Sequence, residues 1–222
     1  KMHYAADPNA DTLLLEEGFL LVDSGGHYLT GTTDITRTIA LGPLTQQMKE
    51  HYTAVCRANL NLAYAKFLYG ASGISLDILA REPLWELGID YKCGTGHGVG
   101  HILNVHEGPN AFRYKINPHS PDAAALEEGM ITTDEPGVYR EGLYGIRIEN
   151  ELLCKKAQKN ENGQFMEFEI ITYVPIDLDA ILPEQMNEKE RRRLNEYHRV
   201  VYEKLADFLD EDERAWLLGC TR

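Results

Sequence analysis

The chain has 222 residues, 43% of them hydrophobic, with 22 basic and 35 acidic side chains and a formal net charge of −13. This length and composition suit one large domain, or one domain with a small appendage, and the acidic balance argues against binding nucleic acid through its phosphates. There is no run of about 18 apolar residues and no secretory signal, so we expect no membrane association.

The N-terminal half of the chain predicts a β-hairpin followed by two helices. Its first residues, KMHYAADPNAD, read like the middle of a protein, so we expect a fragment that lacks upstream residues. Residues 19–41 are rich in apolar, Thr and Tyr side chains around central glycines and predict two strands joined by a turn. A helix capped by Thr45 is predicted up to Gly70, and a shorter one over 76–87, disturbed by Pro83.

The C-terminal half predicts three strands and a helical end. Strand-like sequences cover 130–139, 144–154 and 165–176, and the polar segment 155–164 predicts a plain hairpin loop. After Pro183 the chain predicts helices, the first with an apolar stripe formed by Leu194, Tyr197, Val201, Leu205 and Phe208. Strands gathered into hairpins and combined with helices indicate a mixed α+β fold.

Four acidic residues stand in strand-like or glycine-rich surroundings: Asp23, Asp34, Glu135 and Glu149. Acidic residues are uncommon in strands, and an ionised carboxylate that leaves water needs a partner. Each pair flanks a predicted turn, so a hairpin could bring its two side chains together. Four carboxylates in one pocket repel each other, and divalent cations would relieve that repulsion. The pattern therefore favours a metal site.

Three histidines lie in CGTGHGVGHILNVHEGP, at positions 97, 101 and 106. A carboxylate-rich site with a histidine suits Mn²⁺, Co²⁺ or Zn²⁺. His97 and His101 are four residues apart and share a side of either a helix or a strand, so spacing does not choose between them. The surrounding glycines argue against a helical pair of zinc ligands.

Five segments, in order, resemble the pita-bread metallopeptidases, and within them the Xaa-Pro aminopeptidases: HYAA, LLVDSGGHYLTGTTDITRT, GTGHGVGHILNVHEGP, TTDEPGVY and GIRIEN. The resemblance extends over nearly the whole chain. It implies a pita-bread fold with a mostly antiparallel curved sheet flanked by helices. It also implies a truncated catalytic domain over 1–182 and a helical C-terminal extension over 183–222 that packs on it.

The resemblance also implies a ligand set for two divalent metal ions. The ligands are Asp23, Asp34, His97, Glu135 and Glu149, with Mn²⁺ favoured and Co²⁺ or Zn²⁺ as alternatives. Two such ions balance the charge of four carboxylates. A hydroxide that bridges them would attack the carbonyl carbon of the first residue of the peptide.

Further residues are expected to act on the substrate. By resemblance, His106 and His3 lie near the peptide, while His101 falls where the family requires no histidine and is expected to pack beside the site. Glu135 would take the proton of the nucleophile, and His106 would stabilise the oxyanion or bind the substrate backbone. Arg147 shares a strand face with Glu149 and is expected to orient carboxylates, and Tyr139 is a candidate donor to the substrate.

The expected function is hydrolysis of the N-terminal Xaa-Pro bond of peptides. The alternatives are prolidase, which takes dipeptides, methionine aminopeptidase, and a non-catalytic peptide-binding module, which typically lacks metal ligands. Family members are often dimers or larger, so a homodimer is expected as a partner besides the proline-containing peptide. The four cysteines lie far apart without a CxxC pair, which favours free thiols and a cytoplasmic protein.

Overall fold

A six-stranded sheet and two β-ribbons form the framework in the computed structural model, which describes residue 9 and residues 13–102, 104–115 and 124–222. The sheet is antiparallel throughout, with the strand order β3 (Lys66–Leu68), β10 (Gly163–Ile170), β9 (Asn150–Asn160), β6 (Ile131–Asp134), β4 (Gly96–Val99) and β5 (His106–Phe112). One ribbon pairs β1 (Phe19–Tyr28) with β2 (Gly31–Ala40), and the other pairs β7 (Gly137–Arg140) with β8 (Tyr144–Arg147).

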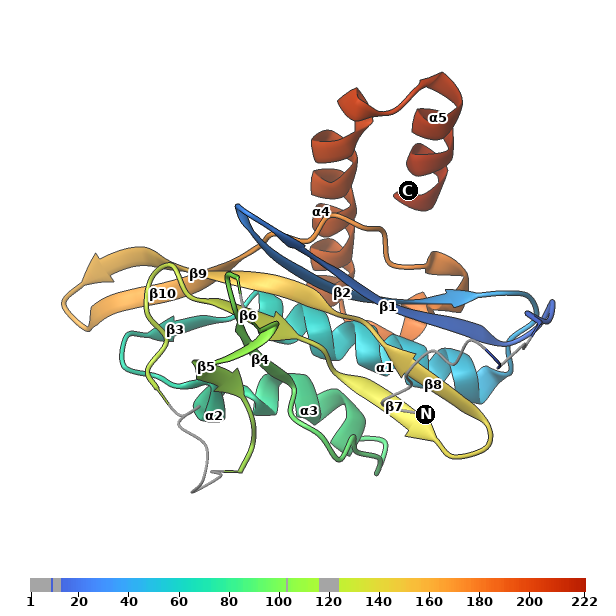
Figure 1. Ribbon diagram of the computed structural model, residues 1–222. Coiled ribbons are helices and arrows are strands. Elements are labelled where there is room, and N and C mark those ends of the chain that lie inside the picture. The colour runs from blue at the N-terminus through green and yellow to red at the C-terminus, as the bar shows by residue number, and fades with distance from the viewer. Residues whose placement is uncertain (1–8, 10–12, 103, 116–123) are drawn as a thin grey trace.

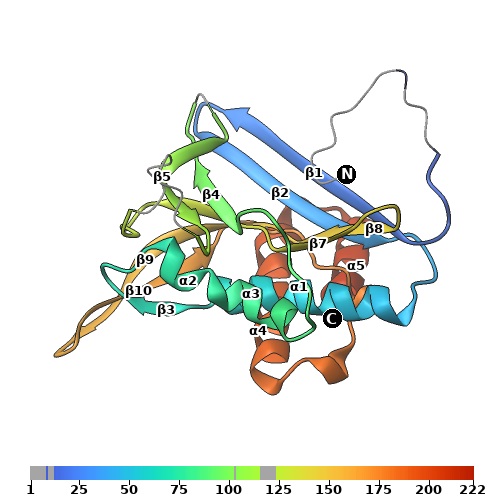
Figure 2. The same ribbon diagram turned by 90° about the horizontal axis from the view of Figure 1, so that it is seen from below.

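In Figure 1 the first three helices lie below the strands, on the side away from the β1–β2 ribbon, and the last two rise at the top of the view. The helices are α1 (Gln46–Ala63), α2 (Gly73–Leu76), α3 (Ile78–Trp85), α4 (Glu188–Leu205) and α5 (Glu211–Cys220). Figure 2, seen from below, shows α1 running beside α3, with β4 and β5 near the tip of the β1–β2 ribbon. Among the described residues, no helix has the length and apolarity needed to cross a membrane.

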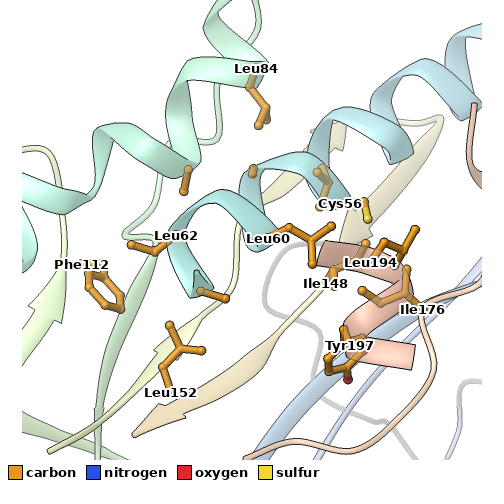
Figure 3. Close-up of a cluster of buried hydrophobic side chains, with 14 of the residues drawn as sticks. Cys56, Leu60, Leu62, Leu84, Phe112, Ile148, Leu152, Ile176, Leu194 and Tyr197 are labelled. Atoms are coloured by element: carbon orange, nitrogen blue, oxygen red, sulfur yellow. The ribbon is translucent and has the colours of Figure 1, made fainter. Parts of the chain in front are cut away.

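The main core lies between α1, the strands and α4. Leu60 and Leu62 of α1 are completely buried and belong to one cluster with Ile148, which precedes β9, and Leu152 within β9 (Figure 3). Tyr197 of α4 covers the same cluster. Burial of side chains of this size stabilises the fold by about 1.5–3 kcal/mol each.

Arg37 ties the β1–β2 ribbon to the rest of the molecule. Its buried guanidinium donates to the carbonyl oxygen of Glu149 at 2.7 Å, to the side chain of Asn150 at 2.8 Å and to the hydroxyl of Tyr197 at 2.6 Å. It also donates to the carbonyl of Val174 at 2.8 Å. One side chain therefore joins β2, the start of β9, α4 and the segment before α4.

The predicted first hairpin and the N-cap at Thr45 are confirmed, but the predicted end of the first helix is wrong. The helix ends at Ala63, and Lys66–Leu68 pairs with β10 instead. Phe67 fits the helical apolar pattern, but in the strand it is also buried, with its ring centroid 5.1 Å from that of Phe168. The predicted helix over 76–87 is present as α2 and α3.

Two details of the C-terminal half also differ from the prediction. Most of 155–164 is strand, because β9 continues to Asn160 and β10 starts at Gly163, so the polar residues pair through their backbones while their side chains largely face water. The apolar stripe does not include Phe208, which lies beyond the end of α4 and is 85% exposed.

His198 of α4 makes stability depend on pH. Its Nε2 accepts the N–H of Ile176 at 3.0 Å, and burial, helped by the charge of Arg37, lowers its pKa to about 4. An unfolded histidine titrates near 6.5, so the unfolded state binds more protons between these values and the fold loses stability as pH falls. Between pH 7 and pH 5 this effect lowers the free energy of unfolding by about 2 kcal/mol. We expect His198→Gln, which keeps a hydrogen-bond acceptor, to abolish this part of the pH dependence. Urea unfolding of both proteins measures this, and parallel pH curves would contradict it.

Candidate active site

A pocket of about 370 Å³ opens where the two ribbons meet the sheet. It is lined by Asp23, Asp34, Cys93, Gly94, Gly96, His97, His106, Arg113, Glu135, Tyr139, Arg147 and Glu149. Every site residue predicted from the sequence is in this set except His3, which lies outside the described residues. The structure therefore brings together side chains that are up to 126 positions apart, from Asp23 to Glu149.

The β1–β2 ribbon supplies Asp23 and Asp34. Asp23 pairs with Thr36, and Asp34 pairs with Gly25, which lies two positions after Asp23. The two acids therefore lie on the same face of the ribbon. Glu135 and Glu149 lie just outside β7 and β8, in the short connections to β6 and β9. All four acids line the pocket, as expected if each hairpin directs its pair toward one site.

His97 of β4 lies at the centre of the pocket. Its Nδ1 donates to the Gly98 carbonyl at 3.0 Å, which leaves Nε2 directed at the acids. Nε2 is 3.4 Å from a carboxylate oxygen of Asp34 and 3.4 Å from one of Glu135. Ligand atoms of Asp34, His97 and Glu149 all lie within 4.8 Å of one another.

Threonine hydroxyls orient the two glutamates. Thr36 donates to Glu149 at 2.6 Å, and Thr133 donates to Glu135 at 3.1 Å. Thr133 also accepts the backbone N–H of His97 at 3.0 Å, so one hydroxyl contacts both Glu135 and the strand of the histidine. These hydroxyls hold the two carboxylates in place at the pocket.

Arg147 makes the contacts expected of a residue that orients carboxylates. Its guanidinium forms an ion pair with Asp23, donates to Thr36 at 3.0 Å and donates to the Tyr139 hydroxyl at 2.9 Å. Its Nε is 4.0 Å from Glu135. Asp23 is 53% exposed and faces Arg147 rather than the group formed by Asp34, His97 and Glu149.

The pKa directions in the pocket reflect crowding of negative charge. Burial, followed by the charges of Glu135 and Asp34, raises the pKa of Glu149 well above its usual range. Burial also raises the pKa of Glu135, although His97 and Arg147 oppose the shift. Burial alone would lower the pKa of His97, but hydrogen bonds to Asp34 and Gly98 and the charge of Glu135 raise it. A cation among these groups would relieve the repulsion.

The donor set fits divalent metal ions. Carboxylate oxygens with one imidazole nitrogen are a ligand combination that Mn²⁺, Co²⁺ and Zn²⁺ accept. The Nδ1 bond to Gly98 fixes the tautomer whose Nε2 is available to a metal. Glu149, at 2% exposure, is a buried carboxylate that accepts from Thr36, and a cation would suit it as a further partner.

The other two histidines of the glycine-rich stretch occupy different places. The ring of His106 lies edge-on to that of His97 with a centroid separation of 4.1 Å, and His106 lines the pocket. His101 is exposed, and its Nε2 donates to the Leu29 carbonyl at 3.1 Å in the turn of the β1–β2 ribbon. The structure thus separates His97 from His101, which spacing left equivalent.

Sequence reasoning missed several residues of this region. Cys93 and Arg113 line the pocket, and the only signal for them is their position on either side of the histidine stretch. Glu151 accepts the backbone N–H of Asp34 at 3.0 Å, and burial raises its pKa to about 7. Its position two residues after Glu149, on the same side of a strand, could have identified it.

Comparison with known proteins identifies the family. Residues 1–156 match the sequence profile described as metallopeptidase family M24, and residues 164–222 match that of the C-terminal region of peptidase_M24. The chain belongs to metallopeptidase family M24. Its fold is the pita-bread fold of that family, so the predicted mixed architecture with a mostly antiparallel sheet and a helical C-terminal end is confirmed.

Individual relatives support the same assignment. Aminopeptidase P1 of Arabidopsis thaliana is 40% identical over 99% of the chain, and a probable Xaa-Pro aminopeptidase P of Botryotinia fuckeliana is 41% identical over 97%. The X-prolyl aminopeptidase of Caenorhabditis elegans, described as a cytosolic enzyme with a di-nuclear active site, superposes on 91% of the chain with a TM-score of 0.84 and 39% identity. The chain spans about a third of the length of these proteins, 34%, 33% and 33% respectively.

Gly96 is required for the close approach of β4 to β6. A Cβ at this position would lie 1.8 Å from the Thr133 carbonyl oxygen, which is backbone and cannot move aside by itself. We expect Gly96→Ala to lower the free energy of unfolding by about 1–3 kcal/mol and to weaken metal binding, because His97 follows directly. Urea unfolding measures the first effect. The control is Gly219→Ala on α5, where no atom lies within 4 Å of the added Cβ, and an equal loss in both variants would contradict the expectation.

Proposed function

We propose that this chain is the catalytic part of a metal-dependent aminopeptidase that hydrolyses the N-terminal Xaa-Pro bond of peptides. The observation that carries the proposal is the convergence of Asp34, His97 and Glu149, with Glu135 beside them, in one pocket. The names of the relatives, Xaa-Pro aminopeptidases in plants, fungi and Caenorhabditis elegans, supply the substrate class. Within this proposal, residues 1–182 form the catalytic domain and 183–222 a helical extension.

Five residues would hold two divalent ions, with Mn²⁺ favoured: Asp23, Asp34, His97, Glu135 and Glu149. Four carboxylates and two divalent ions balance in charge, and the ions would oppose both the burial and the neighbouring negative charges that raise the pKa of Glu149. Asp23 would turn from Arg147 toward the ions, and its exposure leaves it room to do so. When bound, such ions act as Lewis acids and make hydroxide available near neutral pH.

The protein's own groups would bind the peptide and move protons. Glu135 lies between His97 and Arg147 and would accept the proton of the attacking water. His106, packed edge-on to His97, would bind the scissile carbonyl or stabilise its developing charge. Arg147 would keep Glu135 in place, and Tyr139, which accepts from Arg147, would keep its own proton to donate to the peptide.

Metal binding tests the ligand set separately from catalysis. A separate test is useful because the chain spans about a third of the length of its relatives, whose activity belongs to the whole proteins. We expect calorimetric titration of the wild-type chain with Mn²⁺ to give two ions per chain. His97→Ala should abolish this binding, because it removes the imidazole ligand, and His101→Ala should leave it intact, since His101 contacts Leu29. The reverse order of losses would refute the assignment of the histidines.

Peptide hydrolysis tests the activity and its substrate class. In the Mn²⁺-loaded chain we expect cleavage of an Xaa-Pro bond in a peptide longer than two residues. Glu135→Gln should lower kcat by about 10²–10⁴, the range of a lost general base, while Glu141→Gln, in the β7–β8 turn outside the pocket, should not. Hydrolysis of Xaa-Pro dipeptides alone would indicate a prolidase, and full activity after metal removal would exclude the proposed chemistry.

A further inference from the structure

Arg81 of α3 is a buried cation outside the pocket. It is the largest fully buried side chain of the described residues, and its guanidinium lies between the rings of Tyr91 and Tyr114 at 4.1 and 4.4 Å. Its Nε donates to Asp77 at 2.6 Å and its Nη1 donates to Asp90 at 2.8 Å. A buried charge with this many partners is costly to assemble, and such an arrangement holds its partners in one geometry.

The same guanidinium holds the chain that leads to β4. It donates to the backbone carbonyls of Tyr91 and Cys93 at 2.9 and 2.8 Å. The second carboxylate oxygen of Asp77 accepts the Thr95 hydroxyl at 2.5 Å. Segment 91–95 is therefore fastened to α3 at three points, and Cys93 within it lines the pocket.

Thr95 in turn contacts the backbone of Glu135. Its carbonyl accepts the Glu135 N–H at 2.7 Å, and its own N–H donates to the Phe112 carbonyl at 2.9 Å. The next residue, Gly96, approaches the Thr133 carbonyl so closely that no Cβ fits. A displacement of Thr95 would therefore move the backbone of Glu135 and of the strand that bears His97.

We propose that the network of Arg81, Asp77 and Thr95 positions Glu135, so that α3 determines where this carboxylate lies in the pocket. These three are positioning residues, since none lines the pocket. The inference rests on the proposed function in one respect, because there Glu135 is a metal ligand and the proton acceptor. The flat, multiply bonded guanidinium of Arg81 suits this task in a way that the single ammonium of a lysine does not.

The test breaks the network at its mildest point. Removal of Arg81 would leave Asp77 buried and unpaired and would threaten folding. Thr95→Val replaces the hydroxyl, which bonds Asp77 and the Tyr91 hydroxyl, with a methyl group, and Thr95→Ser retains the hydroxyl. The control is Thr53→Val on α1, since Thr53 is equally buried and loses comparable bonds, to the Lys49 carbonyl and from the Leu182 N–H, outside the pocket.

We expect Thr95→Val to raise the Mn²⁺ dissociation constant and to lower kcat by about 10-fold or more each, with KM nearly unchanged. The Glu135 amide, followed by hydrogen–deuterium exchange without metal, should exchange faster than in the wild type. Thr95→Ser should restore all three values, and Thr53→Val should lower stability alone.

Two failures are distinguishable. Equal amide exchange at Glu135 in Thr95→Val and Thr53→Val would overturn the positioning role, whatever the activity. A wild-type chain that neither binds Mn²⁺ nor cleaves Xaa-Pro peptides would overturn the proposed function, and the exchange comparison would still decide whether Thr95 holds Glu135.

Discussion

Mutual repulsion among carboxylates in one partly buried pocket is the constraint around which this molecule is organised. Glu149 is almost fully buried, Asp34 and Glu135 lie within 3.4 Å of the same imidazole nitrogen, and burial raises the pKa of both glutamates. Such a cluster destabilises a fold unless hydrogen bonds and cations offset it. The chain itself provides part of this stabilisation, through hydrogen bonds from Thr36 and Thr133 and the positive charge of Arg147.

The pocket is a meeting point of separate sheets. The β1–β2 ribbon, strand β4 and the connections around β7 and β8 each contribute acids or the histidine, and the ribbon is fastened to the rest by Arg37. Arg37 and Arg81 have related roles, since each is a buried guanidinium that donates to backbone carbonyls of more than one residue. Neither arginine lines the pocket, but each bonds the carbonyl of a residue that does, Glu149 and Cys93 respectively.

Much of this site could be predicted from the sequence, because acids within strand-forming residues are unusual enough to be noticed. Asp23, Asp34, Glu135 and Glu149 were identified in that way, and the resemblance, not spacing, selected His97. Arg81 and Thr95 could not be found, since an arginine in a short helix and a threonine beside glycines look ordinary until burial is known. The end of α1 was misplaced for a related reason. Phe67 suits both a helical stripe and a strand, and only pairing with β10 decides between them.

Glu135 and Glu149 lie at the two junctions where the chain leaves the six-stranded sheet for the β7–β8 ribbon and returns from it. Their separation is therefore set at the base of the ribbon, while its turn at 141–143 lies at the other end of the ribbon, six residues from each. Insertions and deletions at that turn can accumulate during evolution without altering the distance between the two glutamates. The ribbon can therefore vary in length and at its tip while the spacing of the two glutamates at its base is kept.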